Sequence, residues 1–101
     1  MASVKFMRQP TVAGTPIKME FDVAGIEFLV KNLTDGDIYV AMGDIDTTDL
    51  TVAKEACVLI PEGTAQVLTA YNGIYLCTEE TVTIIPDTTS EKGVEVQCLK
   101  W

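Results

Sequence analysis

The densest group of oxygen ligands in this chain is the segment Asp44-Ile45-Asp46-Thr47-Thr48-Asp49. Carboxylates and carbonyls on a flexible loop are the ligands that Ca²⁺ prefers. The EF-hand pattern wants an acidic or amide residue at position five and glycine at six, whereas these positions hold Thr48 and Asp49, although Glu55 at position twelve fits. We therefore expect a solvated acidic loop and no functional metal site.

Few residues in this chain could perform acid–base or nucleophilic catalysis. Histidine is absent, which removes the commonest general base and every Ser-His or Cys-His pair. Glu79 and Glu80 are adjacent, but neighbouring strand residues point to opposite faces, and this pair lies at a predicted turn. Glycine-rich motifs for phosphate or dinucleotide binding are also missing. We expect no catalytic residues, no cofactor and no enzyme.

The cysteines Cys57, Cys77 and Cys98 stand singly, 20 and 21 residues apart, each in an apolar, strand-like run. Structural zinc sites supply cysteines as close pairs, so zinc is not expected. An odd number of separated cysteines suits free thiols in a reducing compartment. We expect reduced, buried thiols, with Cys57 and Cys98 packed as small apolar residues.

The charge of the chain restricts its partners. Fifteen acidic residues oppose 7 basic ones, the formal charge is −8, and no lysine or arginine cluster exists. Nucleic acid and anionic membrane surfaces are therefore not expected as partners. Residues 1–8 lack the apolar core of a signal peptide, so we expect synthesis in a host cytoplasm without a leader.

The stretch from Ile26 to Asp44 has the clearest structural pattern. Ile26, Phe28 and Val30 alternate with Glu27, Leu29 and Lys31, and Ile38, Val40 and Met42 alternate with Tyr39 and Ala41. Between them lies Thr34-Asp35-Gly36-Asp37, and Asp-Gly is a favoured centre of a tight turn. The pattern predicts a β-hairpin.

Short strands separated by turn residues are predicted along the rest of the chain. Residues 45–54, with weak periodicity, are expected to form a surface loop with one short strand at most. The predicted strands are Ser3–Arg8, Ile17–Asp22, Glu55–Ile60 (buried on both faces), Ala65–Ala70 (paired back across the turn Pro61-Glu62-Gly63-Thr64), Ile74–Cys77 (after an Asn-Gly turn), Thr81–Ile85 and Val94–Trp101.

This pattern predicts an all-β chain: a single-domain antiparallel β-sandwich over residues 1–101, jelly-roll-like or Ig-like, with about nine short strands. Pro10 and Pro16 separate the first strand from the body, so residues 1–16 could form an N-terminal arm or strand.

The two termini are the predicted contact region. Val4, Phe6 and Arg8 lie on the detached first strand, and Leu99 and Trp101 close the chain. An edge strand with exposed apolar side chains invites a partner, so we expect a homo-oligomer or a lattice-bound subunit. The alternative is that the termini pair within one sandwich and bury Trp101 against its own core.

Five stretches together resemble a group of small all-β structural proteins encoded by tailed bacteriophages and prophages, often among the head genes. They are Val4–Pro10, Phe28–Leu33, Gly36–Val40, Ile60–Val67 and Val94–Trp101. The resemblance implies a virion component such as a capsid decoration or head accessory protein, whose partners are other copies of itself and a major capsid protein.

A second reading stays open at this stage. The chain could be a carbohydrate- or cell-surface-binding module of a fibre or tail, with Tyr71, Asn72 and Tyr75 around a loop as its platform. Glycan binding would favour this reading, and co-purification with capsids would favour the first.

Overall fold

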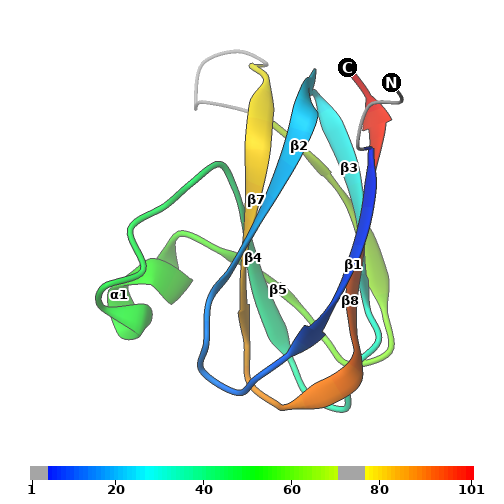
Figure 1. The fold of residues 1–101 in the computed structure, drawn as a ribbon. Helices are drawn as coiled ribbons and strands as arrows, with labels where there is room; N and C mark the ends of the chain where they lie inside the picture. Colours follow the sequence, from blue (N-terminus) through cyan, green and yellow to red (C-terminus); the bar gives the residue numbers. More distant parts are fainter. Residues whose placement is uncertain (1–4, 71–76) are drawn as a thin grey trace.

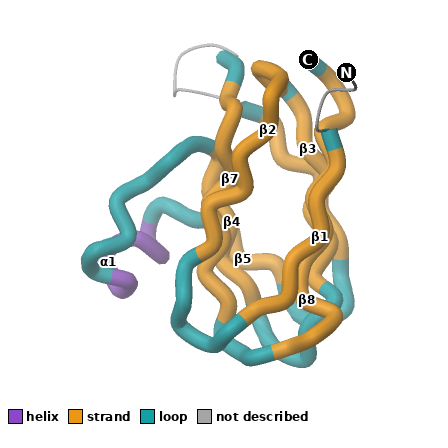
Figure 2. The backbone as a smooth tube through the Cα atoms, viewed as in Figure 1, coloured by secondary structure: helices purple, strands orange, loops and turns teal. Residues whose placement is uncertain are grey.

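The computed structural model describes residues 5–70 and 77–101. This part of the chain forms eight strands and one short helix (Figure 1, Figure 2). In chain order the elements are β1 (Phe6–Thr11), β2 (Ile17–Gly25), β3 (Glu27–Asn32), β4 (Ile38–Met42), α1 (Leu50–Glu55), β5 (Val58–Ile60), β6 (Ala65–Thr69), β7 (Glu79–Pro86) and β8 (Ser90–Lys100). The predicted Asn-Gly turn and nearly all of the strand after it lie outside the described residues.

The strands form two four-stranded antiparallel sheets that pack face to face. Sheet A has the order β1-β8-β3-β6 and sheet B the order β2-β7-β4-β5. In Figure 1, sheet A forms the right-hand layer and the segment with α1 projects on the opposite side. The prediction of an all-β antiparallel sandwich is confirmed, and this strand order is that of a jelly roll.

Among the strands that the structure describes, consecutive ones lie in different sheets except for β4 and β5, whose connection carries α1. The predicted hairpin from Ile26 to Asp44 is therefore wrong. β3 pairs with β8 and β6 in sheet A, whereas β4 pairs with β7 and β5 in sheet B. Alternation identified both strands correctly, but it does not say which sheet a strand joins.

A buried asparagine organises this crossing between the sheets. The amide Nδ2 of Asn32 donates to the carbonyls of Gly36 at 2.8 Å and Ile60 at 3.0 Å. Its Oδ1 accepts from the backbone N–H of Thr34 at 2.9 Å and from the Thr34 hydroxyl at 2.7 Å. All four bonding positions of the amide are occupied. Because Gly36 does not adopt a positive φ, the crossing depends on this network rather than on an Asp-Gly hairpin turn.

The second predicted hairpin is also wrong. Pro61 to Thr64 carries the chain from β5 in sheet B to β6 in sheet A, with Gly63 at a φ of +68°. The expected strand Glu55–Ile60 shrinks to Val58–Ile60, and Val58 and Leu59 are exposed rather than buried. Glu55, the first residue of the expected strand, belongs instead to α1.

Helix α1 stands where a loop was predicted. Asp49 caps its N-terminus, with Oδ1 accepting from the backbone N–H of Thr51 at 3.0 Å and of Val52 at 3.3 Å. Six residues are too few to display a helical period, so the hydrophobic pattern carried no signal for it. The cap residue in front of a short run of helix-compatible residues was the remaining signal.

The core lies between the sheets and consists of the inward-facing alternate residues of both. Phe21 and Phe28 meet across the layers with ring centroids 5.2 Å apart. The other buried members are Ile17, Met19, Val30, Ile38, Val40, Ile60, Leu68, Val82, Ile84, Val94, Val96 and Cys98.

Candidate interaction face

Strand alternation and register define the outer face of sheet A. Since the core residues of its strands point inward, the residues between them point outward. The register places Phe6 beside Gln97, Gln97 beside Leu29, and Leu29 beside Val67. These four side chains form one row across all four strands.

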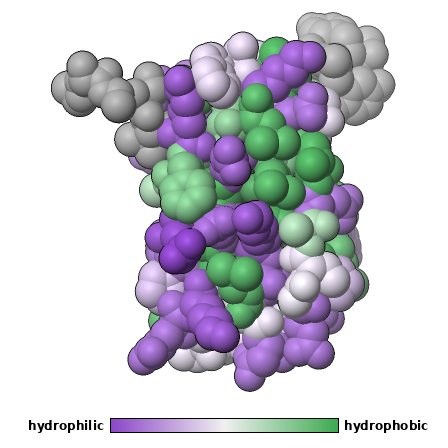
Figure 3. Space-filling model, turned by 90° about the vertical axis from the view of Figure 1, so that its right-hand side faces the viewer, coloured by the Kyte–Doolittle hydropathy of each residue, from purple (hydrophilic) through white to green (hydrophobic). Residues whose placement is uncertain are grey.

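Three of the four residues in this row are apolar, and Leu99 lies next to them on the same face. Phe6 is 51% exposed, Val67 47% and Leu99 41%, while Leu29 is half-buried. We call Phe6, Leu29, Val67 and Leu99 the apolar patch. Figure 3 faces this side of the sandwich and shows hydrophobic side chains gathered over its upper part. A group of apolar side chains that spans a sheet is typical of an interaction surface.

The C-terminal Trp101 directly follows β8. It is 57% exposed, and the ammonium of Lys5 lies 4.0 Å from the centroid of its ring. The two terminal strands do pair with each other, since β1 lies along β8. The alternative prediction was that the termini pair within one sandwich and bury Trp101 in the core. The strands do pair, but Trp101 is not buried.

A row of charges crosses the sheet beside the apolar patch. Nη2 of Arg8 lies 2.7 Å from Oε1 of Glu95, and Nζ of Lys31 lies 3.0 Å from its Oε2. We call these three residues the ion row. The hydrogen bond from Arg8, and next that from Lys31, holds the pKa of Glu95 below its ordinary value. The Glu95 side chain is only 8% exposed between its two cations.

The outer face of sheet B, by contrast, is covered. Residues 43–57 lie against it, so the outward-facing Ile85 and Ala41 are buried although neither belongs to the core between the sheets. The ammonium of Lys54 on α1 sits 4.7 Å from the ring centroid of Tyr39, which also points outward. The chain thus shields the apolar side chains on the central strands of one outer face, although Leu59 on the edge strand β5 stays 47% exposed, and leaves those of the other face open.

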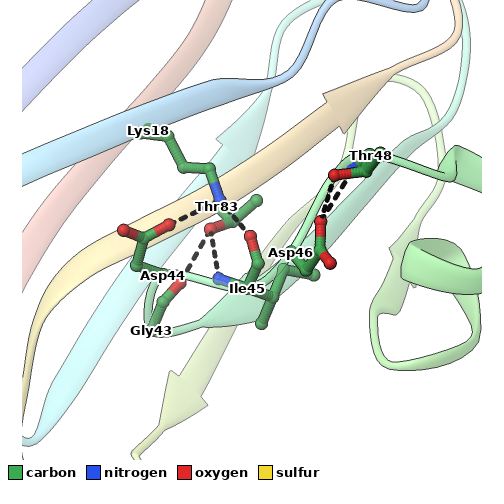
Figure 4. A network of polar contacts seen from close by, with 7 residues as sticks. All are labelled: Lys18, Gly43, Asp44, Ile45, Asp46, Thr48 and Thr83. Carbon is green, nitrogen blue, oxygen red and sulfur yellow. Dashed lines mark hydrogen bonds and ion pairs between the residues drawn. The ribbon is translucent and has the colours of Figure 1, made fainter.

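A polar network ties this covering segment down (Figure 4). The Thr83 hydroxyl donates to the carbonyl of Gly43 at 2.7 Å and accepts from the backbone N–H of Ile45 at 3.4 Å. Lys18 pairs with Asp44 at 2.6 Å and also donates to the carbonyl of Ile45. The segment is therefore fixed to both β2 and β7.

The three carboxylates of the acidic segment are each used locally. Asp44 pairs with Lys18, and Asp49 caps α1. Asp46 accepts from the backbone N–H and the hydroxyl of Thr48 at 2.9 and 2.6 Å, and these bonds lower its pKa. Within residues 5–70 and 77–101, no group of three or more potential metal ligands is found.

The cysteines carry free thiols at separate places in the fold. Cys98 is buried in the core, whereas Cys57 and Cys77 are half-buried. Burial raises the pKa of the thiols of Cys57 and Cys98. The expectation that Cys57 is buried like Cys98 is therefore met only in part.

The contact residues predicted from the termini fall on or beside one face. Phe6 and Leu99 belong to the apolar patch, Arg8 belongs to the ion row, and Trp101 adjoins them, while Val4 lies outside the described residues. Sequence reasoning missed Leu29 and Val67 as members of the patch. Glu79 and Glu80 begin β7 rather than occupying a turn, and the platform of Tyr71, Asn72 and Tyr75 falls in a part of the chain that the structure does not describe.

No family model, curated protein or solved structure gives a significant match to this chain. Among the described residues, no helix has the length and apolarity that a membrane span requires.

Proposed function

We propose that this chain is a structural protein of a phage virion, a capsid decoration or head accessory subunit that acts by protein–protein contact rather than by catalysis. The observation that carries the proposal is the contrast between the two outer faces. Residues 43–57 cover Ile85 and Ala41 on sheet B, where Leu59 on the edge strand stays exposed, whereas sheet A leaves Phe6, Val67 and Leu99 open on three of its strands.

The contrast matters because an antiparallel sheet normally turns polar residues to water on its outer face. A monomer would gain solubility from charges at these positions, but sheet A places apolar side chains there on each of its four strands. Contact with another protein would remove these apolar side chains from water, which is favourable.

Two further points support a virion role. Jelly rolls are a common architecture of viral capsid domains, although they also occur in lectins, so the fold alone does not select the function. The resemblance to small phage structural proteins includes residues of β1, β3, β6 and β8, the strands that build sheet A. Repeated weak contacts on a symmetric shell can together give firm attachment.

Mass spectrometry of purified phage particles from the bacterium that encodes the chain tests this proposal. We expect peptides of this protein in the particle band at a copy number comparable to that of the shell protein. Intact particles that lack the chain, together with binding of the purified protein on a glycan array, would instead support the carbohydrate- or cell-surface-binding module.

A further inference from the structure

We propose that the outer face of sheet A binds a second copy of this chain across a two-fold axis that runs along the row of Phe6, Gln97, Leu29 and Val67. The inference rests on the proposed function as a contact protein and names the first partner of the contact face. The face has three features that suit a symmetric pair: a row that is apolar at three of its four positions, an acidic and a basic residue of β3 that exchange places across the row, and little net charge.

The geometry of the row allows a self-complementary pair. In a two-fold interface the same surface of both subunits meets, so that if one residue contacts a second, the second contacts the first in return. An axis lying along the row, between two facing sheets, sets each row residue opposite its own counterpart. Leu29 of one copy then faces Leu29 of the other, and Phe6 and Val67 pack in the same way at the two ends.

The same axis exchanges the residues on the two sides of the row. On β3, Glu27 and Lys31 flank Leu29 at two residues on either side, so all three point outward. Lys31 of one copy therefore lies across from Glu27 of the other, and the symmetry repeats this contact. Glu27 makes no ion pair within the described part of the chain, so its carboxylate is available to a neighbour.

The distribution of charge favours this face over the others. Two copies of a chain with a formal charge of −8 repel each other. The strands of sheet A, however, carry four basic and three acidic residues, whereas the rest of the chain carries three basic and twelve acidic ones. Sheet A is thus the side on which two copies can approach without strong repulsion.

Sedimentation velocity of the full chain, from low micromolar to millimolar concentration, tests the inference. We expect a reversible equilibrium between monomer and dimer that stops at the dimer. Glu27→Lys sets like charges opposite each other at both symmetric contacts and should weaken the dimer about tenfold. Glu62→Lys makes the same change of charge on the exposed turn after β5 and should not weaken it.

A second pair of variants tests the apolar row. Val67→Ser should weaken the dimer, whereas Val52→Ser, at an exposed position of α1, should leave it unchanged. Thermal unfolding of each variant establishes that it is folded. A monomer at every concentration, assemblies that grow past the dimer, or equal effects of Glu27→Lys and Glu62→Lys would each overturn the inference.

These outcomes are independent of the test of the virion role. A wild-type monomer that is nevertheless found in purified particles would overturn the dimer and leave the proposed function standing. A dimer that is absent from particles would do the reverse.

Discussion

Arg8 and Glu95, 87 residues apart in the chain, are joined side chain to side chain, with Nη2 and Nε of the guanidinium 2.7 and 3.1 Å from one carboxylate oxygen. The contact ties the first strand to the last, so β1 is held in sheet A by side chains as well as by its ladder with β8. Because Lys31 bonds the other oxygen, the ion row also links β3 and stiffens the face that carries the apolar patch.

The ion row predicts a pH dependence of stability. Arg8 and Lys31 lower the pKa of Glu95 in the folded chain relative to the unfolded one, where it is about 4.3. The stabilisation is therefore present above that unfolded pKa and is lost as pH falls through the lowered folded value. Urea unfolding should show that Glu95→Gln is less stable than wild type at pH 7 and that the difference shrinks in acid.

A matched variant separates this effect from a general change of charge. Glu91→Gln removes a carboxylate from an exposed position of β8 that forms no ion pair within the described residues. It should match wild type at pH 7. A constant gap between wild type and Glu95→Gln from pH 7 down to strong acid would contradict the account.

Asn32→Ala should destabilise the fold by about 2–4 kcal/mol, because it leaves buried carbonyl and N–H groups at the sheet crossing without partners. Gln66→Ala removes an exposed amide from β6 and should change stability by about half a kcal/mol at most. Chemical unfolding measures both. Equal effects of the two variants would show that the Asn32 network does not hold the crossing.

Substitution by alanine should destabilise the fold by different amounts at two glycines that share a positive φ. Gly63 and Gly93 have φ values of +68° and +62°, but a Cβ at Gly63 would meet nothing, whereas one at Gly93 would lie 1.9 Å from the carbonyl oxygen of Gln9. Gly63→Ala should cost about 1 kcal/mol for the backbone strain alone. Gly93→Ala should cost roughly 3 kcal/mol or more, because β1 must move away from β8. Similar unfolding free energies for the two variants would refute this difference.

Thiol labelling should distinguish the cysteines. Cys98 lies in the core and burial raises the pKa of its thiol, so its native-state labelling at pH 8 should be slower than in denaturant by roughly a hundredfold or more. The half-buried Cys57 and Cys77 should react sooner. Cys98→Ala identifies the slow phase, and rapid labelling of all three thiols in the folded protein would contradict the structure.

Strand positions were largely predictable from the sequence, but their partners were not. Alternation marks the apolar side of a strand, and it located β2, β3, β4, β7 and β8 closely. Alternation carries no information on whether the next strand joins the same sheet. Asp35-Gly36 therefore suggested a hairpin, whereas the chain crosses to the other sheet here and the buried amide of Asn32 stabilises the crossing. That network depends on Ile60, which is 28 residues away in the sequence.

The contact face was predictable in part for the same reason. Phe6 was predicted because Pro10 and Pro16 separate its strand from the body, and Leu99 and Trp101 because the chain closes on an aromatic residue. Leu29 and Val67 join them only through the strand register of sheet A, which no local pattern shows. The available signal was that Leu29 stands between Glu27 and Lys31 on the polar side of its strand.

Disulfide trapping at the centre of the row tests most directly whether the bare face of sheet A is a contact surface. Leu29→Cys places a thiol on the proposed axis, so two copies present it to each other. Under mild oxidation at low protein concentration, we predict a disulfide-linked dimer. Wild type, with its three native cysteines, and Thr81→Cys on the outer face of sheet B should form no disulfide-linked dimer under the same conditions. Trapping of Leu29→Cys that is no faster than that of Thr81→Cys would contradict the account.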